Sequence, residues 1–165
     1  MNHVEIEVLR DRDDHDREAD LAAVASLLTQ VSRTAPPLTS ERLRAVLETP
    51  ATTVLVARLG GQIVGMALLL TLTTFGGDFG HVEEVVVDWG YRGMGISTAL
   101  VTELLRLAAR KRLRHVDLTS RPVREAANSL YRSTGFIVRD TNCYRHDLAG
   151  QIPELIDFLS CKANH

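Results

Sequence analysis

One stretch of the chain constrains its fold more than any other. In it, an apolar run typical of a strand is followed by three glycines and then by a long amphipathic pattern typical of a helix. The run is Val85-Val86-Val87, the glycines stand at positions 90, 93 and 95, and the pattern extends from Ile96 to about Arg110. A buried strand, a tight glycine turn and a helix start bring backbone N–H groups and a positive dipole end to one point. The segment therefore predicts a binding site for a pyrophosphate in an α/β fold.

The rest of the chain alternates strand and helix signals. Two glycines, Gly60-Gly61, separate apolar β-branched runs and predict a hairpin, and Asp16 is a possible cap of the first helix. The predicted strands cover Val4–Val8, 53–59, Gln62–Thr74, 81–87, 115–119, 136–139 and 143–148. The predicted helices cover about 21–31, about 40 onward, Ile96–Arg110, Glu125–Ser133 and about 152–159. This order predicts a mixed α/β sheet whose last two strands form a closing hairpin.

Length and composition exclude several classes of protein. A chain of 165 residues without repeats or a low-complexity linker predicts one domain over 1–165, with 151–165 as a C-terminal helical extension. We expect a cytoplasmic protein, because no apolar run is long enough to span a bilayer and the acidic N-terminus lacks a signal-peptide pattern. The net charge of -2 argues against nucleic acid as a partner. Cys143, Cys161 and the six histidines show no metal-ligand spacing, so we expect no metal.

Two sequence blocks resemble one known family. Arg92-Gly-Met-Gly-Ile-Ser97 is similar to the acyl-CoA signature of the GNAT acetyltransferase superfamily, Arg/Gln-x-x-Gly-x-Gly/Ala, with Ser97 in the last position. The block from Glu125 to Phe136 resembles the family's Ala-x-x-Leu-Tyr-x-x-x-Gly-Phe block. The two blocks occur in the family's order, with a helix and a short strand between them, and the resemblance covers nearly the whole chain.

The resemblance implies a fold and a cosubstrate. The fold is a mixed, mainly antiparallel sheet flanked by helices, in which two central strands splay apart. Acetyl-CoA would lie in the splay, its pantetheine pairing with the main chains of Val85 and Val87. Its pyrophosphate would take the backbone amides of Arg92, Gly93, Met94, Gly95, Ile96, Ser97 and Thr98.

One position of the second block departs from the family. Many members carry an asparagine seven residues before the tyrosine, where it contacts pantetheine, but this chain has Arg124 there. Asn128 stands three residues before the tyrosine, and two interpretations of it stay open. In the first, Asn128 contacts the cofactor in place of the family's asparagine. In the second, it is an exposed helix residue.

Acetyl transfer to an amine requires a base for the amine and an acid for the departing thiolate. By resemblance, Tyr131 is that acid. Glu83 is the preferred base and His81 the second choice, and strand alternation places these two on one face and Glu84 on the other. The segment from Gly80 to Val87 also resembles the corresponding strand of glucosamine-6-phosphate acetyltransferases, which does not by itself identify the acceptor.

The sequence thus predicts an N-acetyltransferase in which a small-molecule or peptide amine attacks acetyl-CoA directly in a ternary complex. An acyl-CoA-binding regulatory module without turnover is the alternative, and a phosphate-binding module of another fold is a third interpretation. A homodimer is a further expectation, because the predicted last helix carries an apolar face beyond the strands that complete the domain. That face consists of Leu155, Ile156 and Leu159.

Overall fold

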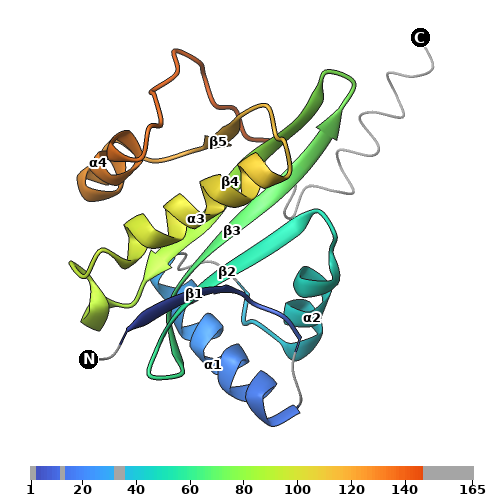
Figure 1. The fold of residues 1–165 in the computed structure, drawn as a ribbon, viewed down its shortest axis with the longest axis vertical. Helices are drawn as coiled ribbons and strands as arrows, with labels where there is room; N and C mark the ends of the chain where they lie inside the picture. The colour runs from blue at the N-terminus through green and yellow to red at the C-terminus, as the bar shows by residue number, and fades with distance from the viewer. Residues whose placement is uncertain (1–2, 12–13, 32–35, 147–165) are drawn as a thin grey trace.

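The computed structural model describes residues 3–11, 14–31 and 36–146, and these form one five-stranded sheet flanked by helices (Figure 1). The strands lie in chain order and pair antiparallel, except for a parallel pair formed by β4 and β5. This arrangement confirms the predicted mixed, mainly antiparallel α/β sheet. The strands are β1 (Val4–Val8), β2 (Thr52–Leu59), β3 (Gln62–Thr74), β4 (Gly77–Val87) and β5 (Val116–Leu118).

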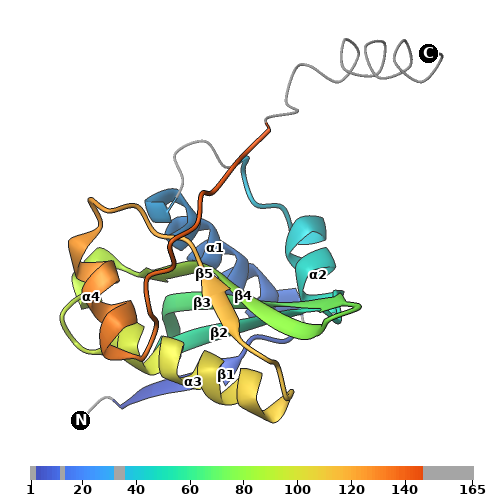
Figure 2. The same cartoon turned by 90° about the horizontal axis from the view of Figure 1, so that it is seen from above.

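Helices cover both faces of the sheet. In Figure 2, α1 (Asp14–Val31) and α2 (Ser40–Glu48) lie on one face and α3 (Ile96–Arg110) lies on the other. The remaining helical elements are a 3₁₀ turn, η1 (Trp89–Tyr91), and α4 (Glu125–Ser133). Because α1 begins at Asp14, the interpretation of Asp16 as its cap is wrong, and Asp16 lies within the helix.

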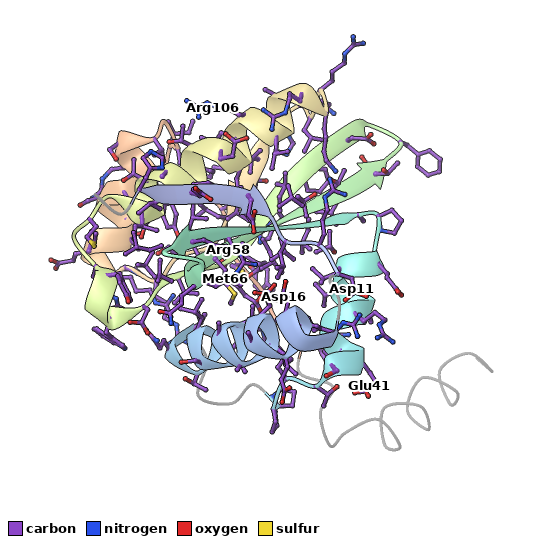
Figure 3. The ribbon with its side chains drawn as sticks, turned by 60° about the horizontal axis from the view of Figure 1, so that its bottom comes forward. Asp11, Asp16, Glu41, Arg58, Met66 and Arg106 are labelled. Carbon is purple, nitrogen blue, oxygen red and sulfur yellow. The ribbon has the colours of Figure 1, made fainter. Side chains whose placement is uncertain are left out.

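Each face of the sheet packs its own hydrophobic layer. On the α3 face, Leu100 and Leu104 are completely buried against strand residues such as Ala67 and Leu69. On the other face, Met66 lies between the sheet and α1, as Figure 3 shows, among Leu27, Leu43 and Val86. The alternation of strand side chains between these layers fixes the register, since a slip of one residue would exchange the two faces.

The predicted closing hairpin is absent from the described part of the chain. Residues 136–146 form neither strand nor helix there, so the strand predictions for 136–139 and for the described part of 143–148 are wrong. The composition favours strand, but a strand forms only where a neighbour accepts its backbone hydrogen bonds. None of the described strands pairs with this segment. The predicted helix 152–159, with the apolar face of Leu155, Ile156 and Leu159, lies outside the described residues.

A buried arginine joins three elements of the fold. The Arg58 side chain extends from β2 toward α1 (Figure 3) and lies 2.9 Å from the Asp20 carboxylate. Its Nε also donates to Glu7 of β1 at 2.6 Å, and its Nη1 donates to the Gly61 carbonyl at 3.1 Å. Arg58 and Asp20 are 8% and 6% exposed, so each depends on the other for its charge and hydrogen bonds.

We expect Asp20→Ala to destabilise the protein strongly, because it leaves a buried guanidinium without its buried carboxylate partner. Removal of one partner from a buried ion pair costs about 3–5 kcal/mol. The matched control is Glu103→Ala, which removes an exposed pair with Arg110 and costs below about 1 kcal/mol. Urea denaturation followed by circular dichroism measures both, and similar losses for the two variants would contradict this account of Arg58.

Candidate active site

The turn between β4 and α3 is open and rich in unpaired backbone donors. Gly93 and Gly95 have φ angles of 80° and 77°, and Gly95 caps α3 without a side-chain hydrogen bond. The first N–H groups of a helix have no acceptor within the helix. A Cβ atom placed on Gly93 or on Gly95 would meet no atom within 4 Å. Both positions therefore need glycine for their backbone angle, and the space above them leaves room for a ligand.

Three side chains hold this turn in place. Asp88 accepts hydrogen bonds from the Gly90 N–H at 3.0 Å and from Gln30 of α1 at 2.9 Å. The Gly90 bond first and the Gln30 bond second lower the pKa of Asp88, so its carboxylate stays charged. Arg92 turns back, donates from Nε to the Val87 carbonyl at 3.1 Å and stacks on the Trp89 ring at 3.3 Å. The turn is thus preorganised before any ligand binds.

The other predicted anion-binding residues occupy different positions in this turn. Met94 is 54% exposed and Thr98 is exposed, whereas Ile96 anchors the helix start in the core at 2%. Ser97 is half-buried. The Arg92 N–H is a weak donor to the Trp89 carbonyl at 3.5 Å, so the amides from Gly93 onward are the principal free donors among those predicted.

The splay of two central strands follows from a bulge in β4. Its ladder with β3 shifts between the Met66–Val86 and Leu68–Glu83 pairs, and Glu84 at the bulge has a left-handed φ of 51°. On its other side β4 pairs with β5 only from Gly80 to Val82. Within the described residues, the main chain of β4 beyond Val82 has no strand on this side. Val85 and Val87 lie in this stretch, which runs directly into the glycine turn.

One polar atom beside the splay has no partner. Ser120, two residues after the end of β5, has a buried Oγ with no hydrogen-bond partner among the described residues. A buried hydroxyl without a partner is costly, so its presence indicates that a ligand group or water satisfies it. Ser120 could not be predicted from the sequence, because no pattern marks a single serine after a short strand.

Tyr131 and the β4 carboxylates form one electrostatic group. The Tyr131 ring packs edge-on against Phe136 at 5.9 Å between centroids. Burial raises the pKa of Tyr131, Arg124 lowers it, and the Glu83 charge raises it. Glu83 also lies 3.2 Å from His81, Oε1 to Nε2. The charge of the preferred base therefore influences the predicted acid, although they come from β4 and α4, and the second-choice base lies against the preferred one.

Comparison with known proteins gives one family for this site. The model of the acetyltransferase (GNAT) family matches residues 21–136. Over 127 residues, 72% of this chain and 84% of the other, the chain is 32% identical to a glucosamine 6-phosphate N-acetyltransferase of Trypanosoma brucei brucei. The chain belongs to the GNAT acetyltransferase family. It is therefore an acyltransferase.

Solved structures agree with this assignment. A Trypanosoma brucei acetyltransferase is 31% identical with a TM-score of 0.72, over 88% of this chain and 100% of that one. A putative acetyltransferase from Agrobacterium tumefaciens has a TM-score of 0.76 at 22% identity, over 87% of this chain and 99% of the other, which shows the fold alone.

The Glu84 carboxyl group of this acetyltransferase site has a raised pKa. Burial raises its pKa, the neighbouring Glu83 charge raises it further, and Arg42 of α2 lowers it. Glu84 therefore loses its proton less readily than an ordinary glutamate. The two adjacent carboxylates have different environments, since the Glu83 side chain is 50% exposed.

Asn128 has a hydrogen-bonding role within the acetyltransferase itself. Its Nδ2 donates to the Arg121 carbonyl at 3.0 Å and to the Pro122 carbonyl at 3.3 Å. These bonds fix the loop that enters α4, and they leave Oδ1 as the group available to a ligand. The sequence analysis also missed Asp88 and Gln30, although an aspartate two residues before a glycine is a known turn signal.

The described residues hold neither a metal-ligand cluster nor a membrane-spanning helix. No group of three His, Cys, Asp or Glu side chains there is arranged to hold a metal ion. None of the helices in that part of the acetyltransferase is long and apolar enough to cross a bilayer.

We expect Gly95→Val to abolish binding of acetyl-CoA. A β-branched residue is strained at a φ of 77° and would fill the open space at the start of α3. The matched control is Gly61→Val, which meets similar strain at a φ of 84° and equally open space in the distant β2–β3 turn. Calorimetry with acetyl-CoA in the presence of a chelator compares the two. If Gly95→Val binds acetyl-CoA normally, the pyrophosphate does not bind at this turn.

Proposed function

We propose that the protein transfers the acetyl group of acetyl-CoA to a primary amine, by direct attack in a ternary complex. The observation that carries this proposal is the continuous path from the glycine turn, along the unpaired main chain of β4, to the group of Tyr131 and Glu83. The amides from Gly93 to Thr98 would bind the pyrophosphate, and the main chains of Val85 and Val87 would bind the pantetheine. The residues present thus fit acetyl-CoA, and family membership supports its use.

Acetyl-CoA supplies an acetyl group activated as a thioester. In the proposed reaction Glu83 accepts a proton from the substrate ammonium, and the amine nitrogen forms its bond to the carbonyl carbon. As the carbon–sulfur bond breaks, the Tyr131 hydroxyl donates its proton to the sulfur. The newly acylated nitrogen then loses its remaining extra proton to the Tyr131 oxygen, which restores the hydroxyl and leaves a neutral amide. The raised pKa of Tyr131 supports this role, because its hydroxyl keeps its proton through the neutral range. The His81 ring, beside Glu83, orients that carboxylate.

For the acceptor, we propose the amine of a phosphorylated amino sugar. The 32% identical relative is named a glucosamine 6-phosphate N-acetyltransferase, and the match spans 84% of that protein. Arginines supply positive charge near the reacting groups, since Arg124 influences Tyr131 and Arg42 influences Glu84.

An assay of free thiol release tests the reaction and the acceptor together. The panel contains glucosamine 6-phosphate, unphosphorylated glucosamine, a polyamine, an aminoglycoside and a peptide N-terminus. We expect the phosphorylated amino sugar to give the highest kcat/KM. Another preferred amine would overturn the acceptor proposal alone. Tight acetyl-CoA binding without turnover on any amine would instead support a regulatory module.

We expect Tyr131→Phe to lower kcat by about 10²- to 10⁴-fold, the usual contribution of a general acid. Affinity for acetyl-CoA should stay nearly unchanged, because the phenyl ring keeps its packing against Phe136 and only the hydroxyl is lost. Steady-state kinetics and calorimetry measure the two quantities. An unchanged kcat would make the tyrosine structural, and a parallel loss of affinity would make it a positioning residue.

The two adjacent glutamates should respond differently to substitution. We expect Glu83→Gln to remove the rise of kcat/KM with pH on the acidic side. Glu84→Gln should keep that rise, because it leaves the Glu83 carboxylate in place. The pH profiles of both variants decide this, and loss of the rise in Glu84→Gln alone would identify Glu84 as the base.

A further inference from the structure

A carboxylate stands at the start of the glycine turn, although the turn is suited to an anion. Asp88 caps η1, and the hydrogen bonds from Gly90 and Gln30, in that order, lower its pKa and keep it charged. A fixed negative charge close to a pyrophosphate is unfavourable, because like charges repel. The presence of Asp88 there needs a structural reason, and the contacts of its two oxygens supply one.

The two carboxylate oxygens of Asp88 bind two different elements. Oδ1 accepts from the Gly90 N–H within the turn, and Oδ2 accepts from Gln30 Nε2 of α1, 58 residues away in sequence. The main chain of Asp88 is fixed as well, since its N–H donates to the Val64 carbonyl and its own carbonyl accepts from the Tyr91 N–H, each at 2.9 Å. The carboxylate thus joins the turn to α1.

The Gln30 amide has one orientation that this contact permits. A flip would place Oε1 against the Asp88 carboxylate, so the charge selects Nε2, the donor, as the group that faces it. In this orientation Oε1 is buried and has no hydrogen-bond partner among the described residues. A buried acceptor without a partner is costly, so we infer that the charge-assisted bond to Asp88 offsets that cost.

The helix that carries Gln30 is firmly packed. Gln30 is the next-to-last residue of α1, and Leu27, one turn earlier, is 2% exposed in the layer that also holds Met66 and Val86. α1 lies on the sheet face opposite α3 (Figure 2), so the bond links the turn before α3 to the helix on the other face. The turn is therefore held from both sides of the sheet.

We propose that Gln30 is a positioning residue for acetyl-CoA. Through Asp88 it holds the turn in the geometry in which the amides from Gly93 to Thr98 meet the pyrophosphate. The inference rests on the proposed function, since it takes acetyl-CoA as the ligand of the turn. Gln30 itself touches no ligand. It acts by preorganisation, so loss of its bond should weaken acetyl-CoA binding while the chain stays folded.

Reversal of the polarity of this bond tests the proposal by calorimetry with acetyl-CoA. Gln30→Glu places a second carboxylate against Asp88, and we expect it to raise the dissociation constant at least about 10-fold at about pH 8. In the double variant Gln30→Glu/Asp88→Asn, the introduced amide can donate to the introduced carboxylate while its oxygen accepts from Gly90. We expect the double variant to restore most of the affinity. The matched control is Thr29→Glu, which adds the same charge at the neighbouring, exposed residue and should leave the constant nearly unchanged.

The pH dependence of binding separates positioning from a loss of fold. Two carboxyl groups in contact have a raised pKa, so as the pH falls one of them in Gln30→Glu takes up a proton and donates to the other. Arg92 is a further charged group that acts on Asp88, and it stays charged throughout. The ratio of the dissociation constants of Gln30→Glu and the wild type should therefore fall toward one between about pH 8 and about pH 5.

Two outcomes with folded variants overturn the proposal alone. These are equal affinity of Gln30→Glu and the wild type at about pH 8, and a loss of affinity that the double variant does not recover. Circular dichroism verifies folding at each pH. If Gln30→Glu does not fold, Gln30→Leu removes the donor without adding a charge, and unchanged acetyl-CoA affinity in that variant overturns the proposal.

Two further outcomes distinguish this inference from the proposed function. A wild-type chain that does not bind acetyl-CoA overturns both, because the turn is then not a pyrophosphate site. If acetyl-CoA binds and the variants behave as expected but no amine gives turnover, the role of Gln30 is supported and the proposed function alone fails.

Discussion

The left-handed backbone at Glu84 is the constraint on which the site depends. A non-glycine residue in this region costs about 1–3 kcal/mol unless the surrounding structure enforces it. Here the bulge places Glu84 and Val85 opposite the single residue Ala67 of β3. The bulge bends β4 away from β5 after Val82, and this divergence leaves main-chain groups of β4 free for a ligand. Without it, β5 would continue along β4 and close the path to the glycine turn.

Packing on both faces of the sheet holds the bulge in place. Val82 and Val87 lie in the layer beneath α3, whereas Val86 lies in the layer beneath α1. Strict alternation would place residues 82 and 86 on one face, so the extra residue at Glu84 is what puts Val82 and Val87 in one layer and Val86 in the other. The burial of these valines therefore offsets the backbone strain. The same bulge places the carboxylates of Glu83 and Glu84 at the point where β4 and β5 part.

Local patterns predicted most of the fold, because they depend on residues near in sequence. The Gly60-Gly61 hairpin, the glycine turn before α3 and the end of α4 at Gly135 follow from local conformational preferences. The sequence does not reveal the bulge at Glu84, since β4 shows no glycine or proline there. It also does not reveal the partners of Arg58, which come from β1 and α1. The strand predictions within residues 136–146 failed for a related reason. The side chains there favour strand, but none of the described strands pairs with them, and the sequence does not show whether a partner is present.

A single charge connects the proposed base and the proposed acid. The negative charge of Glu83 is one of the causes that raise the pKa of Tyr131, and it also raises that of Glu84. When Glu83 accepts a proton from the amine in the proposed reaction, this contribution disappears and the pKa of Tyr131 falls. Tyr131 then becomes a stronger acid at the stage when the thiolate leaves. The first proton transfer thus favours the second.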